Sequence, residues 1–88
     1  EFTIDGSNFQ FAPNIITVQK NDLVRIIFKN TGGTHDFKID EFEVATSQMS
    51  AGASETVEFV ANQTGTFEFY CSVGSHRQTG MVGSLVVE

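Results

Sequence analysis

The chain has only one cysteine, one proline and no tryptophan among its 88 residues. The single cysteine, Cys71, excludes an internal disulfide. A domain of this size buries only about 60–65% of the surface that its unfolded chain exposes. Small domains of this kind often gain stability from a disulfide or from a metal. Because the disulfide is excluded, a bound metal is the remaining one of these two sources.

Basic residues are also scarce, since five lysines and arginines stand against eleven acidic residues and give a net charge of −6. Nucleic acids and anionic membranes bind basic surfaces, so this charge argues against both. The longest apolar-rich run, residues 23–28, is interrupted by Arg25 and is far shorter than the ~20 residues that cross a bilayer. We therefore expect no nucleic-acid partner and no transmembrane segment.

The sequence shows no signal peptide, internal repeat, low-complexity run or linker. It begins at Glu1 rather than Met, so we expect a processed or trimmed chain. The length predicts a single domain over residues 1–88, and we expect a monomer.

Apolar residues recur along the chain at a period of two rather than 3.6, which is typical of strands. Residues 15–18 and 23–28 are rich in β-branched and aromatic side chains and flank the polar segment 20–22, which together predict a hairpin. Further strands are expected at 35–40, 57–61, 66–71 and 85–87. Phe37 and Ile39 are expected to face inward, Val57, Phe59 and Ala61 alternate with Glu58 and Val60, and Phe67, Phe69 and Cys71 share one face.

Short strands at this spacing, separated by turns that carry Gly and Asn, predict an all-β sandwich or barrel. Residues 41–54 are the least regular segment and leave three alternatives open: a loop, a short irregular strand or a single helical turn. The phenylalanines of the strands need no functional explanation, and we interpret the following as core residues: Phe9, Phe11, Phe28, Phe59, Phe67 and Phe69.

Four residues with soft or borderline donor atoms form the one cluster that carries chemistry. Cys71, His76 and Met81 lie in a single loop (CSVGSHRQTGM), and four residues separate each from the next. His35, the only other histidine, follows the pair Gly32-Gly33. A thiolate and two imidazoles bind copper in a trigonal plane, with a thioether weakly bound on the axis. The set therefore predicts one copper ion that cycles between Cu(I) and Cu(II).

Other metals fit these residues less well. Zinc accepts His and Cys, but it has no redox chemistry and little use for a thioether. Iron–sulfur clusters need more thiolates than this chain has, and a dinuclear copper centre needs two bridging cysteines. Each of the four residues alone has an ordinary structural explanation, so the prediction depends on their combination.

The sequence resembles the cupredoxins, the small blue-copper proteins, over most of its length. The similar segments are residues 9–13 (FQFAP), 16–24 (ITVQKNDLV), 30–37 (NTGGTHDF), 65–71 (GTFEFYC) and 80–83 (GMVG). The resemblance implies a cupredoxin-like Greek-key β-sandwich or barrel of about seven to eight strands. Residue by residue, it implies that His35 and His76 are imidazole ligands, Cys71 the thiolate and Met81 the axial thioether.

The resemblance also implies a one-electron carrier that works outside the cytoplasm. Redox partner proteins would dock near His76, whose exposed edge would be surrounded by these neighbours: Val73, Gly74, Ala12, Pro13 and Val82. His35 would be buried, with its free ring nitrogen held by an acceptor. Tyr70, next to the thiolate, is expected to pack on the opposite sheet face or to cap an edge.

One position departs from the family pattern, because Asp36 stands where cupredoxins often have an Asn whose amide tethers the two ligand loops. An ionised carboxylate beside the copper would lower its potential. Two other functions remain open: redox chemistry of the copper on a small molecule such as a nitrogen oxide, which requires an exchangeable coordination position, and copper storage or delivery.

Overall fold

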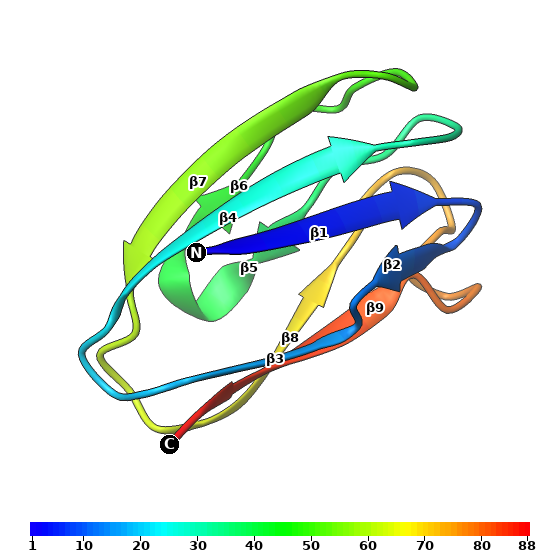
Figure 1. The fold of residues 1–88 in the computed structure, drawn as a ribbon. Coiled ribbons are helices and arrows are strands. Elements are labelled where there is room, and N and C mark those ends of the chain that lie inside the picture. Colours follow the sequence, from blue (N-terminus) through cyan, green and yellow to red (C-terminus); the bar gives the residue numbers. More distant parts are fainter.

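The computed structural model describes all 88 residues and folds them into a sandwich of two mixed β-sheets (Figure 1). One sheet has the strand order β2-β1-β4-β7 and the other β3-β9-β8-β5-β6. The predicted all-β sandwich is confirmed. The elements are β1 (Phe2–Ser7), β2 (Gln10–Ala12), β3 (Ile15–Val18), β4 (Leu23–Asn30), β5 (Lys38–Ile39), the 3₁₀ helix η1 (Asp40–Phe42), β6 (Val44–Ala45), β7 (Ser54–Val60), β8 (Gly65–Tyr70) and β9 (Val82–Val87).

The core lies between the two sheets and consists of 18 buried hydrophobic residues. In β4, the side chains of Val24, Ile26 and Phe28 point inward and alternate with more exposed residues, as the period of two predicts. Phe37 and Phe69 pack with their ring centroids 5.0 Å apart. Each fully buried side chain of this size contributes about 1.5–3 kcal/mol, so the core stabilises the sandwich that carries the site.

Most of the phenylalanines predicted to form the core do so. Phe11, Phe28, Phe59 and Phe69 are buried, and Phe67 is partly buried against the core. The prediction for Phe9 is wrong, because 47% of this residue is exposed. It lies in the turn between β1 and β2, where a period-two pattern no longer reports which way a side chain points.

The predicted hairpin between residues 15–18 and 23–28 is also wrong, because these two strands belong to different sheets. β3 pairs in parallel with β9, whereas β4 pairs with β1 and β7. The segment 19–22 crosses from one sheet to the other, and the Asn21 amide donates to the Ala61 carbonyl across 2.7 Å. Alternation identifies a strand, but it does not identify the strand's partner.

The irregular segment contains all three of the structures left open from the sequence. It begins with the helical turn η1, continues with the short strand β6 and then runs as a loop in which Met49 bridges His35. The expected strand 35–40 shortens to β5, although Phe37 and Ile39 are both fully buried as predicted. The Phe37 amide donates to the Thr46 hydroxyl rather than to a strand, which explains why the strand starts late.

Successive strands repeatedly change sheets, as in a Greek-key sandwich. The turn between β1 and β2, the connection after β4 and the loop between β8 and β9 lie at the same end, on the right in Figure 1. The segments that carry the four predicted ligands therefore meet at this end. The structure contains no helix long and apolar enough to cross a membrane.

Candidate metal centre

His35 is positioned by a buried loop that is held from both sides. The His35 amide donates to the Met49 carbonyl across 3.2 Å, and the Met49 amide returns a hydrogen bond of 3.0 Å. Buried Asn30 donates through Nδ2 to the Gly33 carbonyl at 2.8 Å and to the Met49 carbonyl at 2.7 Å. Sequence reasoning missed this role of Asn30. An amide residue two positions before a Gly-Gly pair was the available signal.

Cys71 and His76 are positioned by the loop between β8 and β9. Cys71 directly follows β8 and is fully buried, and its amide donates to the Met81 carbonyl across 3.2 Å. His76 is only partly buried. Its amide donates to the Val73 carbonyl at 3.0 Å, and its carbonyl accepts from the Met81 amide at 3.0 Å. The loop therefore closes on itself and links the three predicted ligands that it carries.

The donor atoms of His35, Cys71 and His76 converge on one point. The two Nδ1 atoms lie 3.2 Å apart, and the Cys71 sulfur lies 3.9 Å from Nδ1 of His35 and 3.5 Å from Nδ1 of His76. A point equidistant from the three atoms lies about 2.1 Å from each, within the usual range of about 2.0–2.3 Å for metal–imidazole and metal–thiolate bonds. The three side chains therefore fit a trigonal site for one copper ion.

Met81 is fully buried and sits in the same loop, in direct main-chain contact with both other ligand residues of that loop. A Cβ placed on Gly6 would approach the Met81 methyl to 3.4 Å, so β1 packs closely against this side chain. A buried thioether in this loop is compatible with the axial role predicted for Met81, because its sulfur is a soft donor.

Asp36 ties the two ligand segments together. Its amide lies 3.5 Å from the Cys71 sulfur and donates to it. Its buried carboxylate accepts hydrogen bonds from the Ser72 amide at 2.6 Å and from the Ser72 hydroxyl. The carboxylate therefore performs the tethering that the family usually obtains from an Asn amide. Two donors from Ser72 explain how a buried Asp is accommodated there.

Burial shifts the protonation of both buried donors toward their neutral forms. It raises the pKa of the Cys71 thiol, and the amides of Asp36 and Val73 act in the opposite direction. It also lowers the pKa of His35, against an opposing effect of the Gly32 backbone. A neutral imidazole is the form that binds a metal, whereas the thiol must lose its proton to become a ligand.

The prediction that an acceptor holds the free nitrogen of His35 is wrong. Nε2 is buried and has no hydrogen-bond partner. A Cβ added to Gly33 would come within 2.9 Å of Nε2. Gly33 therefore leaves room for the ring, and packing rather than a hydrogen bond to Nε2 fixes its orientation.

The surroundings of His76 include a contact that sequence reasoning missed. The ring of Phe9 lies edge-on to the imidazole, with 4.9 Å between the centroids and 77° between the planes. Of the five predicted neighbours, Val73 contacts His76 through its main chain. The signal for Phe9 was a large aromatic side chain in a turn, a position where such residues seldom serve the core.

Side chains on the outer face of β8 hold the loop that carries His76 in place. Tyr70 points away from the buried Cys71, as predicted, and its hydroxyl donates to Asp40 at 2.7 Å, which raises the pKa of the phenol. The guanidinium of Arg77, the residue after His76, lies 4.0 Å above the Tyr70 ring and pairs with Glu68. The loop is thereby fixed to β8 from outside.

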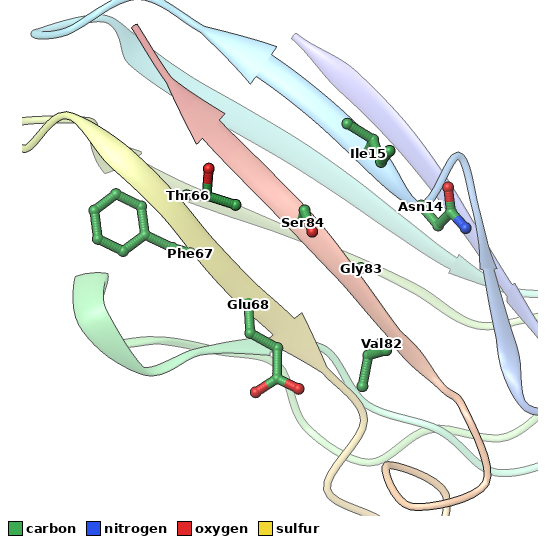
Figure 2. Close-up of a pocket in the computed structure, with 8 residues that line it drawn as sticks. All are labelled: Asn14, Ile15, Thr66, Phe67, Glu68, Val82, Gly83 and Ser84. Carbon is green, nitrogen blue, oxygen red and sulfur yellow. The ribbon is translucent and has the colours of Figure 1, made fainter.

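A surface groove of about 530 Å³ lies elsewhere on the same sheet (Figure 2). Figure 2 shows its lining side chains on β3, β8 and β9 and on the segment before β3: Asn14, Ile15, Thr66, Phe67, Glu68, Val82, Gly83 and Ser84. None of the four predicted ligands lines it. The groove and the candidate metal centre are therefore separate features of this sheet.

Comparison with known proteins agrees with the geometry. The family described as Cupredoxin-like domain matches residues 1–87. A plastocyanin of Sambucus nigra is 35% identical over 94% of this chain and 91% of its own length. The copper-resistant cuproprotein CopI of Rubrivivax gelatinosus is 28% identical over 93% of this chain and 62% of its own length.

Among solved structures, the reduced auracyanin of Roseiflexus castenholzii superimposes with a TM-score of 0.91 at 24% identity, covering 99% of this chain and 95% of that one. This likeness establishes the fold, and the match to the family establishes the membership. With a trigonal set of donors in place at the end of a Greek-key sandwich, the chain belongs to the cupredoxin-like family.

Proposed function

We propose that this protein is a mononuclear type 1 copper protein that carries single electrons, with His35, Cys71, His76 and Met81 as the ligands. The observation that carries the proposal is the convergence of three donor atoms at distances that suit one trigonal metal. Bound copper would supply a one-electron couple between Cu(I) and Cu(II). Met81, fully buried in the same loop, is the thioether that we assign to the axial position.

The protein's own residues prepare the site for electron transfer. Asn30 and Asp36 fix the two ligand segments through buried hydrogen bonds, so the donors are held before the metal arrives. A site that is already organised changes little when an electron enters or leaves. The Asp36 amide donates to the Cys71 sulfur, which stabilises the thiolate form.

We place the docking surface for redox partner proteins around His76. The surrounding segments, residues 8–14, 31–35 and 72–84, contain a single charged side chain, that of Arg77, and this side chain is paired with Glu68. The net charge of −6 therefore resides elsewhere on the protein. A neutral surface suits an uncharged partner surface, so transfer rates should depend only weakly on ionic strength.

The proposal also covers the domain organisation, the oligomeric state and the location of the protein. Residues 1–88 form a single domain, because one core joins the two sheets. We take the monomer as the default state of the domain, and we place it outside the cytoplasm in line with the family resemblance.

Voltammetry of the copper-loaded protein tests the carrier function. We expect a reversible one-electron wave, and a visible spectrum that added azide or nitrite leaves unchanged. A spectrum that shifts with these anions would contradict a closed site and favour redox chemistry on a small molecule. Cys71→Ser serves as the control, because it removes the thiolate while changing little else.

Copper storage or delivery is the second candidate, favoured by the similarity to a cuproprotein described as copper-resistant. This function predicts tight binding of Cu(I) without a reversible couple at accessible potentials. Competition with a Cu(I) chelator, measured beside the voltammetry, separates it from the carrier function.

A further inference from the structure

Phe9 combines two features that cost stability. Its backbone has φ 60°, in the left-handed region that bulky side chains rarely occupy. Its ring is also among the few large apolar side chains exposed to solvent. Backbone strain of this kind persists where the surrounding structure enforces it, and it concentrates at functional sites. The position therefore calls for a role other than stabilising the core.

The ring of Phe9 has a defined partner in His76. The 77° between the planes is an edge-to-face arrangement, which is the favourable geometry for two aromatic rings. His76 also neighbours buried His35, with 5.0 Å between the two ring centroids. The imidazole of His76 therefore has one buried and one exposed aromatic neighbour. The other exposed apolar residues, such as Leu23, have no aromatic contact of this kind and no left-handed backbone.

We propose that Phe9 is a positioning residue for His76. Its ring fixes the tilt of the imidazole and covers part of its accessible surface. The inference builds on the proposed function, in which His76 is a copper ligand. The contact exists without the metal, however, so it can be tested independently of copper.

The test compares Phe9→Gly with Phe9→Tyr and with the control Leu23→Ala, which removes exposed apolar surface from another part of the protein. Diethyl pyrocarbonate modifies histidine side chains, and peptide mass spectrometry distinguishes the two histidines of the apo-protein. We expect Phe9→Gly to raise the modification rate of His76 about two- to tenfold, the factor that corresponds to one edge-to-face pair. Buried His35 should remain unreactive and serves as the internal reference.

Three further results are expected together with that change. Phe9→Tyr keeps the ring and should retain the parent rate, and Leu23→Ala should also react at that rate. Phe9→Gly should unfold at the same temperature as the parent or higher, because glycine adopts a positive φ without strain. Once loaded with copper, Phe9→Gly should show an altered visible and spin-resonance spectrum at unchanged stoichiometry.

An unchanged His76 rate in Phe9→Gly would overturn the proposal. A lower unfolding temperature with both histidines reactive would also overturn it, because it would show that the ring only stabilises the turn. If the parent protein failed to bind copper, the proposed function would fail, while the apo-protein rates would still decide the role of Phe9.

Discussion

The two imidazoles of the site are held in opposite ways. His35 is buried and lies in a loop fixed by main-chain pairing with Met49 and by Asn30 beneath it. His76 is partly exposed, in a self-closing loop that Arg77 clamps from outside. The core therefore fixes one side of the site, while surface contacts fix the other. In the proposed electron carrier, His35 would then supply rigidity and His76 would supply access to partners.

Removing the thiolate shared by both sides should have the largest effect. Cys71→Ser should abolish the intense visible band of the copper-loaded protein, because the covalent thiolate bond produces that band. The protein should still fold, since serine is close to cysteine in size, and circular dichroism checks this. If the colour persists, the ligand assignment is wrong.

Two cavity variants, one at each histidine, test the contrast between the buried and the partly exposed imidazole most directly. His76→Gly opens the partly exposed side, so added imidazole should enter the site and restore the visible band. His35→Gly leaves a space inside the protein, and the same imidazole concentration should restore little or no colour. Titration of both copper-loaded variants with imidazole measures the difference. Equal rescue would contradict the contrast in burial.

The axial ligand should affect the potential while leaving the colour. Met81→Leu keeps a buried apolar side chain of similar volume, so the fold should be retained. The variant should remain coloured and have a higher reduction potential, because losing a weak donor disfavours Cu(II). Voltammetry measures the shift, and a lower potential would count against Met81 as the axial ligand.

The contacts that support the two sides should differ in their contribution to stability. Asn30→Ala removes buried hydrogen bonds to two carbonyls and should lower the free energy of unfolding of the apo-protein by about 1–3 kcal/mol. Arg77→Ala removes an exposed ion pair, whose effect on unfolding should be much smaller. Urea unfolding of both variants tests this. A larger loss of unfolding free energy in Arg77→Ala than in Asn30→Ala would contradict the conclusion that the His35 side is the more rigid one.

Part of the candidate site could be predicted from the sequence, because metal ligands can be recognised from residue types and their spacing. His35, Cys71 and His76 were predicted from their donor atoms, and the structure brings them together. The alternating pattern correctly predicted that Phe37 and Ile39 face inward. It could not give strand partners, since pairing between β3 and β9 joins residues far apart in the sequence.

The contacts that surround the ligands were harder to predict for a related reason. The exposure of Phe9 depends on the left-handed backbone of a turn, which residue types alone do not reveal. The role of Asn30 depends on two carbonyls that later segments bring to it. Asp36 was recognised as unusual, but only the structure shows that Ser72 supplies both of its partners.

Titration of the apo-protein with Cu(II), followed by visible absorption, tests the central claim most directly. The convergence of one thiolate and two imidazoles predicts an intense band that grows linearly and stops at one equivalent of copper. A weak band, or none, at one equivalent would contradict the proposed copper centre.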